Sequence, residues 1–496
     1  MSSDRIGAPE GADAGRRRPN VLLLCTDQQR FDALGCYGND AIQTPALDAF
    51  AGEGALFERC YVQSPVCAPS RATFFTGLYP HNHGLWANGV ALPPGRTFFT
   101  RLLADAGYDC GLMGKLHLAA CEQGRTEPRQ DDGLATFEWA HDPDPGSPEN
   151  AYHRWLKVRH PDLHRLAFSA SEHRSRGEAP FKTLPAEGHY SHWVAERAIA
   201  FMRRERTPDQ PFFLMANFFD PHHAFGAPEE YLARYRGVEI PPPVTGPAEL
   251  DGKPAMQREA SRESYAGFAP GFQSYEAGEI AEIRRAYYAM VSLVDDEVRR
   301  ILGCLDELGL RDDTLVVFTS DHGEMLGDHE LLLKGPVMYD PAVRVPLMLR
   351  WPGVVPAGVR RDELVQWIDL PSTLMAAAGV PAPGQLQGSD LLPLAAKSGP
   401  WTRDWALCEY RNSGHPYDPP VHTTMLRQGR HKLVRWHGRG GREPEGELYD
   451  LEADPSELVN LWADPGQART RLRLTELLLD VLVATEDRRQ PREANW

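Results

Sequence analysis

The sequence lacks any hydrophobic run long enough to cross a membrane. Its 496 residues are 42% hydrophobic and 25% charged, which is ordinary for a soluble globular protein. The apolar run from Val21 to Cys25 is far shorter than a bilayer span. Residues 1–19 are polar, rich in Gly and Ala, and without the apolar stretch that a signal peptide needs. We therefore expect a disordered N-terminal tail over these residues and no membrane partner.

Cysteine is also scarce, and the 53 basic residues are outnumbered by 69 acidic ones. The eight Cys residues have neither the spacing of a disulfide framework nor that of paired zinc ligands, which predicts reduced thiols and a cytoplasmic protein. The formal net charge of −16 argues against a nucleic-acid partner, because nucleic-acid binding needs an excess of Lys and Arg. It does not exclude a small anionic substrate, since a local cluster of cations can outweigh distant charge.

Apolar runs that end in polar residues predict an α/β protein. Residues 20–27, 212–218 and 314–320 are continuous apolar runs of the kind found in parallel strands that are buried on both faces. Helical periodicity marks residues 191–204 and 280–308. Strands that alternate with helices indicate a largely parallel sheet, and ligands gather at the carboxyl ends of such strands.

Weaker patterns complete the predicted organisation. Shorter strands are expected at 55–62, 109–113 and 344–351, and further helices at 44–51, 97–106 and 368–378. Residues 119–185 are rich in charge, Pro and Gly, and we expect an irregular insertion there. The length allows about two to four domains. Short strands and a closing helix follow residue 400, so we predict a catalytic domain over 20–398 and a C-terminal subdomain over 399–496.

The most informative stretch surrounds Cys67, in the pattern Cys-Ala-Pro-Ser-Arg. No second Cys lies within four residues, so the pattern is a poor zinc half-site. A buried Cys at a helix start, with Pro69 and Ser70 as helix-start residues, is the structural alternative. The pattern resembles the signature of type I sulfatases, and the flank from Thr76 to Gly84 is similar to that family's continuation of it.

This resemblance, which extends from about Asn20 to Trp462, implies a fold and a modification. The fold is alkaline-phosphatase-like α/β, with a large mixed sheet flanked by helices and a smaller C-terminal α+β subdomain. In the family the Cys is oxidised after synthesis to formylglycine, an aldehyde whose hydrate is the nucleophile. The resemblance therefore implies conversion of Cys67 to formylglycine and a formylglycine-generating enzyme as a partner during maturation.

Two distant strand ends carry candidate metal ligands. Hard divalent ions prefer carboxylate and carbonyl oxygens, and a His admits a somewhat softer ion. By similarity to the family, one divalent ion is held by Asp27, Gln28, Asp321, His322 and the modified Cys67. Many sulfatases have Asp at the position of Gln28 and several have Asn at that of His322. We expect Ca²⁺, with Mn²⁺ as the alternative.

The resemblance also assigns catalytic roles to cationic and imidazole side chains. Arg71 would hold the aldehyde hydrate. In Gly114-Lys115-Leu116-His117, Lys115 would contact sulfate and His117 would be the base for sulfate release. A His suits such proton transfers because its pKa lies near the working pH.

Three further residues would complete the substrate site. His222 and Lys334 would bind sulfate and protonate the leaving group, and Asn88 would line the pocket. A lone His or Lys is more often structural or solvated, but His222 lies just beyond an apolar strand and Lys334 closely follows Asp321 and His322. The remaining Cys residues, Cys121 among them, are expected to be packing thiols.

These assignments predict a sulfuric ester hydrolase acting on a sugar, aryl or alkyl sulfate. The nearest alternative is a phosphonate monoester hydrolase or phosphodiesterase of the same superfamily, in which Tyr and Thr take the positions of Lys115 and His117. A noncatalytic binding protein with unmodified Cys67 is a second alternative. An oligomer is left open. We expect residues 119–185, 241–274 and 409–422 to determine specificity, with side chains that include Trp155, Arg411 and His415.

Overall fold

The computed structural model describes residues 18–121, 124–143, 147–169, 184–438 and 444–486. Residues 1–17 of the predicted tail lie outside these ranges, and the domain boundary at 398 stays a prediction. In the described ranges, every helix is too short or too polar to cross a membrane.

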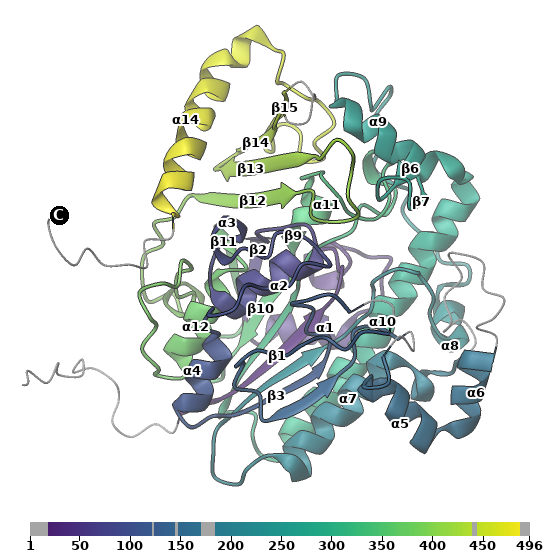
Figure 1. The fold of residues 1–496 in the computed structure, drawn as a ribbon, viewed down its shortest axis with the longest axis vertical. Coiled ribbons are helices and arrows are strands. Elements are labelled where there is room, and N and C mark those ends of the chain that lie inside the picture. Colours follow the sequence, from purple (N-terminus) through teal and green to yellow (C-terminus); the bar gives the residue numbers. More distant parts are fainter. Residues whose placement is uncertain (1–17, 122–123, 144–146, 170–183, 439–443, 487–496) are drawn as a thin grey trace, which may run out of the picture.

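A mixed sheet forms the centre of the molecule (Figure 1). Among the described residues it has nine strands, and the eight that form a continuous path are, in spatial order, β11 (Val359–Gln366), β2 (Ala55–Tyr61), β10 (Leu347–Arg350), β8 (Thr314–Ser320), β1 (Asn20–Thr26), β5 (Phe212–Asn217), β3 (Asp109–Gly114) and β4 (Thr136–Trp139). The remaining strand, β9 (Arg344–Val345), pairs with β2.

The strands β2, β8, β1, β5 and β3 all run in the same direction. β1 is parallel to β5 and β8, and β3 is parallel to β5. β10 is antiparallel to both β8 and β2, which makes β2 parallel to β8. The carboxyl ends of these strands therefore lie at one edge of the sheet, where open α/β folds place their ligands.

Helices bury both faces of the sheet. On one side β1 packs Leu22 and Leu24 into a core shared with α7 (Tyr190–Ala200) and α10 (Ala277–Glu307). On the other side Val21 and Leu23 pack into a core shared with α2 (Cys67–Thr76), α4 (Phe99–Asp105) and α12 (Asp369–Ala377). Alternate side chains of a strand point to opposite faces, which explains why this strand is apolar throughout.

A second, antiparallel sheet follows the first (Figure 1). Its strands are β12 (Trp405–Arg411), β13 (His422–Gln428), β14 (His431–Trp436) and β15 (Glu445–Asp450). Helix α14 (Ala468–Ala484) packs Leu474, Leu478 and Val481 on this sheet. The predicted fold class, a large mixed sheet with helices and a smaller C-terminal α+β unit, is confirmed.

One prediction of local structure was wrong, and one strand was missed. Residues 119–185 are not simply irregular, because their described part contains β4, α5 (Ala151–Arg159) and α6 (Pro161–Ser169). The strand β4 has only four residues and forms by pairing with β3, which no local pattern reveals. β11 was not predicted either, since its first half is polar and its pairing with β2 defines it.

Short elements complete the described chain. They are η1 (Gly35–Tyr37), α1 (Pro45–Gly52), α3 (Pro80–His83), η3 (Ala186–Gly188), η4 (Phe201–Glu205), α8 (Glu229–Leu232), η5 (Ala233–Tyr235), α9 (Ala255–Arg262), β6 (Glu263–Ser264), β7 (Ala269–Pro270), η6 (Phe272–Ser274), η7 (Asp328–Glu330), α11 (Asp340–Val343), α13 (Leu392–Ala395) and η8 (Pro465–Gln467).

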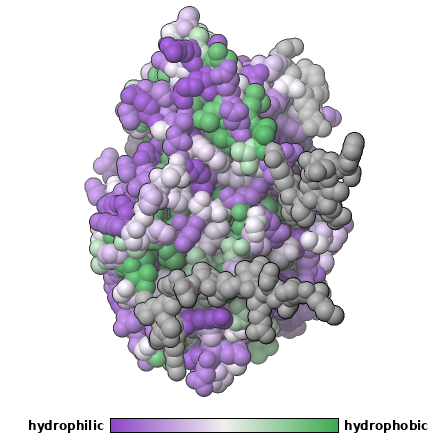
Figure 2. All heavy atoms as spheres, turned by 90° about the vertical axis from the view of Figure 1, so that its left-hand side faces the viewer, coloured by the Kyte–Doolittle hydropathy of each residue, from purple (hydrophilic) through white to green (hydrophobic). Residues whose placement is uncertain are grey.

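The surface on the side of α14 mixes hydrophobic patches with hydrophilic residues (Figure 2). α14 contributes the exposed side chains of Leu472, Leu479 and Val483. The spacing of seven and then four residues puts these three side chains on one face of the helix.

Candidate active site

The Cys67 side chain lies where the ends of β1 and β8 meet. Its Sγ is 3.7 Å from Oδ1 of Asp27 and 3.0 Å from Nε2 of His322. The ligand atoms of Asp27, Cys67, Asp321 and His322 all lie within 4.8 Å of one another, and all four side chains are buried. Residues predicted from distant parts of the chain are thus brought together.

Cys67 is the first residue of α2, as the structural alternative also required. Two contacts fix this helix start against the sheet. Ser70 donates its hydroxyl to the backbone oxygen of Asp321 at 2.6 Å, and Asn88 accepts the N–H of Ala68 at 3.1 Å. The free N–H groups of a helix start favour negative charge, so the position suits an anionic nucleophile and an anionic substrate.

Arg71 joins both carboxylates of the site. Its Nε lies 2.8 Å from Oδ2 of Asp321, and its Nη2 lies 3.2 Å from Oδ2 of Asp27. Although burial opposes the charge, the two carboxylates raise the pKa of Arg71 above its usual value. Arg71 is therefore a permanent cation, one helical turn beyond Cys67 on the same face of α2.

Lys115 follows β3 and faces the same carboxylate. Its Nζ is 2.7 Å from Oδ2 of Asp27, and its backbone oxygen accepts from Asn217 at 2.7 Å and from Arg71 at 3.0 Å. Gly114, just before it, has a φ of +109°, and a Cβ there would overlap the carbonyl oxygen of Asn217. Asn217, at the end of β5, was not predicted to contribute to the site.

Lys334 approaches the site from the opposite side. Its Nζ lies 2.6 Å from Oε1 of Gln28, 3.2 Å from Sγ of Cys67 and 3.1 Å from Nε2 of His322. The amide nitrogen of Gln28 donates to Glu324, a buried acid that was not predicted. Its position two residues after His322 was the one feature of the sequence that could have indicated that Glu324 belongs to the site.

Surrounding cations govern the charge of the Cys67 thiol. Burial and the nearby Asp27 raise the thiol pKa, whereas Lys115, Lys334 and His322 lower it, and the net shift is downward. The pKa of Asp27 also lies well below its usual value, because nearby cations, Lys115, Arg71 and Lys334 among them, outweigh the effect of its burial. The site therefore stabilises negative charge.

His117 and His222 belong to the same cavity. Burial is the main reason that the pKa of each lies well below the usual value; Lys115 adds to the effect at both, and Lys334 adds to it at His222. Nδ1 of His117 is buried and has no hydrogen-bond partner among the described residues. A buried, neutral imidazole with a free nitrogen can accept a proton.

The cavity at this edge has a volume of about 640 Å³. All three segments that were predicted to determine specificity line it, through residues that include Arg125 and His141, Tyr265, and His415. Trp155 and Arg411 do not line it, contrary to expectation. The indole of Trp155 donates to Glu196, and Arg411 donates to Glu409 and to the backbone of β13.

The donor set suits a divalent metal ion. Two carboxylates, from Asp27 and Asp321, and the imidazole of His322 converge with Cys67 in a buried space. The side-chain oxygen of Gln28 accepts a hydrogen bond from Lys334, whose ammonium group also lies beside Cys67 and His322. Oxygen-rich sites with one nitrogen fit hard to intermediate divalent ions.

Comparison with known proteins identifies the family. The family model for sulfatases matches residues 19–380, and a model described as N-sulphoglucosamine sulphohydrolase, C-terminal, matches residues 327–484. The uncharacterized sulfatase YidJ of Escherichia coli is 31% identical over 95% of this chain and 88% of that protein. The N-acetylglucosamine-6-O-sulfatase of Bacteroides thetaiotaomicron is 27% identical over 93% of this chain and 86% of that protein.

A solved structure of a different specificity shares the fold. The phosphonate monoester hydrolase of Agrobacterium radiobacter is 27% identical, with a TM-score of 0.79 and coverage of 95% of this chain and 96% of that one. The sulfatase family in general implies a divalent metal and a formylglycine derived from Cys. Because the sulfatase model spans most of the sequence and the named relatives agree with it, the chain belongs to the sulfatase family of the alkaline phosphatase superfamily and is a sulfuric ester hydrolase.

Proposed function

We propose that this enzyme hydrolyses the sulfate ester of a sugar, with formylglycine at position 67 as nucleophile and one Ca²⁺ ion as cofactor. The observation that carries the proposal is the position of Cys67. Its thiol lies at the start of α2, against Asp27 and His322 and 3.2 Å from the ammonium group of Lys334. A packing thiol needs no such arrangement of charges.

In this proposal Asp27, Gln28, Asp321, His322 and residue 67 hold the ion. When bound, Ca²⁺ neutralises the sulfate group and polarises its oxygens. Arg71 keeps both carboxylates oriented, because it contacts each of them. Gln28 stands where many sulfatases have a carboxylate, which lowers the negative charge of the site. The imidazole of His322 admits Mn²⁺ as the alternative ion.

The aldehyde explains why a Cys is used at all. When formed from Cys67, its hydrate supplies two hydroxyls on one carbon. One attacks sulfur and displaces the ester oxygen, and the other then loses its proton, so that the C–O bond to sulfate breaks and the aldehyde forms again. Lys115 and Lys334 place positive charge where the sulfate oxygens gain negative charge. Asn88, by holding the N–H of Ala68, keeps the start of α2 in place at the cavity wall.

Two imidazoles divide the proton transfers. His117 accepts the proton on sulfate release, since its pKa is lowered by burial and its Nδ1 has no hydrogen-bond partner among the described residues. His222 and Lys334 protonate the leaving oxygen. A bound sulfate anion beside His222 would raise the pKa of this residue and favour the protonated form that the role requires.

A sugar is the favoured leaving group for two reasons. The cavity of about 640 Å³ lies in the range of small-molecule sites. His415 lines the cavity, and its ring stacks on that of the exposed Phe268 with centroids 4.0 Å apart, so aromatic side chains of the kind on which sugar rings pack lie beside the site. The relative from Bacteroides thetaiotaomicron, by its name, acts on a sulfated amino sugar.

The first experiment tests the nucleophile. The chain is produced with and without a formylglycine-generating enzyme, and its intact mass is measured. Conversion of Cys67 lowers the mass by about 18 Da, because SH₂ is replaced by O. Activity on a sulfated glucosamine is expected only in the converted protein, and Cys67→Ser is expected to lower kcat/KM at least about 10³-fold. Equal activity of the unconverted protein would contradict the proposal.

A second experiment separates sulfatase from phosphonate hydrolase. The converted enzyme is given an aryl sulfate and a phosphonate monoester with the same leaving group. We expect the sulfate to be hydrolysed faster, because Lys115 and His117 stand where the alternative enzymes have Tyr and Thr. A higher kcat/KM for the phosphonate would reverse the assignment. Some phosphonate turnover is compatible with the proposal, since both reactions place negative charge on peripheral oxygens.

Metal removal tests the ion. Protein stripped with a chelator is expected to lose activity and to melt at a lower temperature, and Ca²⁺ is expected to restore both. Restoration by Mn²⁺ at lower concentration than Ca²⁺ would establish the alternative ion. The Asp321→Asn variant is expected to lose the thermal shift, whereas Asp362→Asn, which changes an exposed acid, is expected to keep it. The cytoplasmic location stays a prediction.

A further inference from the structure

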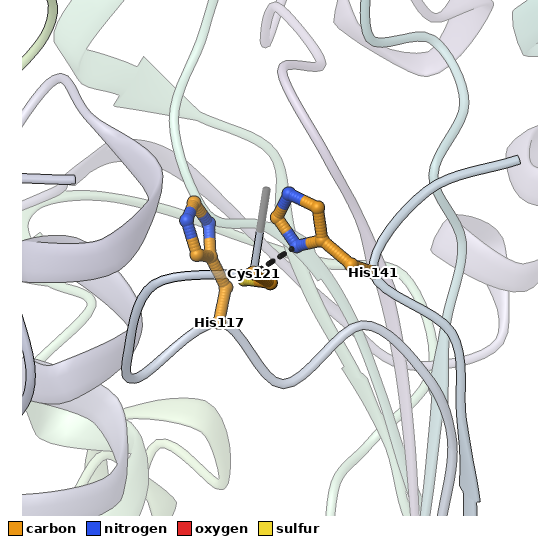
Figure 3. Close-up of side chains that lie close together, drawn as sticks. All are labelled: His117, Cys121 and His141. Carbon is orange, nitrogen blue, oxygen red and sulfur yellow. Dashed lines mark hydrogen bonds between the residues drawn. The ribbon is translucent and has the colours of Figure 1, made fainter. Parts of the chain in front are cut away.

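A second cluster of metal-binding side chains lies in the cavity wall. His117, Cys121 and His141 each offer one ligand atom, and these atoms lie within 4.8 Å of one another (Figure 3). The imidazole rings of His117 and His141 have centroids 4.5 Å apart, and the thiol of Cys121 lies beside both. All three residues line the cavity of the proposed active site.

The distances fit a tetrahedral zinc ion. Zn–S bonds of about 2.3 Å and Zn–N bonds of about 2.0 Å, at tetrahedral angles, separate the sulfur from each nitrogen by about 3.5 Å. Sγ of Cys121 is 3.3 Å from Nδ1 of His141. The thiol also lies 3.1 Å from the backbone oxygen of Ala119, so it is held at the side of the cluster. Three protein ligands that face a cavity leave a fourth position for water, as in open zinc sites.

Neighbouring carboxylates support the two loops that carry the ligands. Nε2 of His141 lies 3.8 Å from a carboxylate oxygen of Asp142, on the ring side opposite the thiol, which is close enough for an ion pair with a protonated ring but too far for a hydrogen bond. Glu127 accepts the backbone N–H of His117 at 2.9 Å and the indole N–H of Trp139 at 3.0 Å. Because Trp139 ends β4 and His117 follows β3, this acid ties both loops together and positions the cluster.

The unused nitrogen of His117 is a second, independent observation. Nδ1 of this ring is buried and lacks a hydrogen-bond partner among the described residues, although most buried polar atoms are paired. A ligand at the cluster would satisfy it. The donors are one thiolate and two imidazoles, which are soft to intermediate and differ from the oxygen-rich set around Asp27.

We propose that His117, Cys121 and His141 bind a zinc ion and that bound zinc inhibits the enzyme by occupying His117. The binding stands on the cluster alone, whereas the inhibition rests on the proposed role of His117 in sulfate release. Cys121, expected from the sequence to be a packing thiol, is then a metal ligand. The Ca²⁺ site and the zinc site lie in one cavity and select their ions by different donors.

Cobalt tests the binding without reference to activity, because Co²⁺ bound by a thiolate has a charge-transfer band in the near ultraviolet. The full chain carrying Cys67→Ser is used, so that the proposed Ca²⁺ site offers no thiol. One equivalent of Co²⁺ is expected to produce the band and Zn²⁺ to abolish it. Adding Cys121→Ser is expected to remove the band, and adding His141→Asn to weaken Co²⁺ binding at least about tenfold.

The matched control is Cys36→Ser, which removes a partly buried thiol outside the cavity and is expected to keep the band. Melting curves of all variants establish that they are folded. Because two ligands are substituted separately, the test still stands if one of these two variants does not fold. Absence of the band in the Cys67→Ser protein, or its survival after Cys121→Ser, would refute the zinc site.

Inhibition is measured on the converted enzyme in excess Ca²⁺. Zn²⁺ is expected to abolish hydrolysis, and a zinc-selective chelator to restore it. Each variant is compared with its own zinc-free rate, and Cys121→Ser is expected to need at least about tenfold more Zn²⁺ for half-inhibition. Equal zinc sensitivity of Cys121→Ser would show that zinc acts elsewhere. If the converted enzyme hydrolyses no sulfate ester, the proposed function and the inhibition both fail, and the cobalt band still decides whether zinc binds.

Discussion

Arg71 shows how much of this site depends on one side chain. One guanidinium reaches Asp27, Asp321 and the backbone oxygen of Lys115 at the same time. Such a planar group with several donors can hold two carboxylates at fixed positions, which a single ammonium group cannot. The two acids would otherwise repel each other in a buried space. Arg71 therefore positions the proposed metal ligands and balances their charge.

The substitution Arg71→Lys tests this role. The Lys keeps the charge but cannot reach Asp27, Asp321 and the backbone oxygen of Lys115 at the same time, so we expect kcat/KM to fall about 10²-fold. We also expect the free energy of unfolding to fall by about 1–3 kcal/mol, since a buried acceptor loses its donor. Kinetics and denaturant unfolding measure the two effects. Arg59→Lys, which changes a more exposed ion pair with Asp362, is the control and should change stability by less than about 0.5 kcal/mol. Wild-type activity in Arg71→Lys would rule out the bridging role.

At the scale of elements, the ends of parallel strands deliver the site. β1 ends before Asp27, β8 before Asp321 and β3 before Lys115, and the common direction of these strands brings the three ends to one edge. The last residue of β3, Gly114, packs directly against the carbonyl of Asn217, at the end of β5. The close approach of these two strand ends fixes the direction in which Lys115 leaves the sheet.

Gly114→Ala is expected to disturb the site through its backbone. The added Cβ meets the carbonyl oxygen of Asn217, and the residue must also hold a φ of +109°. We expect a melting temperature several degrees lower and a loss of activity of about 10²-fold. Gly107→Ala, near the start of the same strand, has a φ of +90° but no atom within 4 Å of the new Cβ. It measures the cost of backbone strain alone, so equal effects of the two variants would contradict the proposed close contact.

At the scale of the whole molecule, a buried acid links the two sheets. Glu409, in β12, lies 2.6 Å from Nδ1 of His81 in α3 and 2.5 Å from an Nη of Arg411. α3 follows the Cys67 helix, so this contact joins the C-terminal sheet to the catalytic region. Burial raises the pKa of Glu409, but His81 and Arg411 lower it by more, and the net shift is downward from 4.5.

The pH dependence of stability follows from that direction. An acid with a lowered folded-state pKa stabilises the protein above its unfolded value of 4.5, and the stabilisation is lost as the pH falls through the folded-state pKa. Glu409→Gln should thus lower the free energy of unfolding by about 2 kcal/mol near pH 7 and by much less near pH 3. Denaturant unfolding at both pH values measures this. Glu452→Gln, an exposed acid, is the control, and a pH-independent effect of Glu409→Gln would disprove the linkage.

Local sequence was sufficient for the strands with strong apolar patterns and for the residues at their ends. Asp27 and Asp321 lie at the predicted strand ends because each follows a continuous apolar run, and Lys115 lies just beyond the shorter strand predicted at 109–113. β4 and β11 escaped prediction because they are defined by their pairing with β3 and β2. Asn217 and Glu324 were missed for a related reason, since their roles consist of single contacts to residues far away in the chain.

The amino-acid sequence by itself determined the chemistry that this protein carries: the Cys-Ala-Pro-Ser-Arg stretch, the carboxylates after β1 and β8, and the run Lys115 to His117. Only the tertiary structure decided which of these groups touch, and it added the partnership of Cys121 with His117 and His141. The physical reason is that residue types and periodicity are local, whereas the order and direction of the strands set the distances between groups that lie up to 306 residues apart.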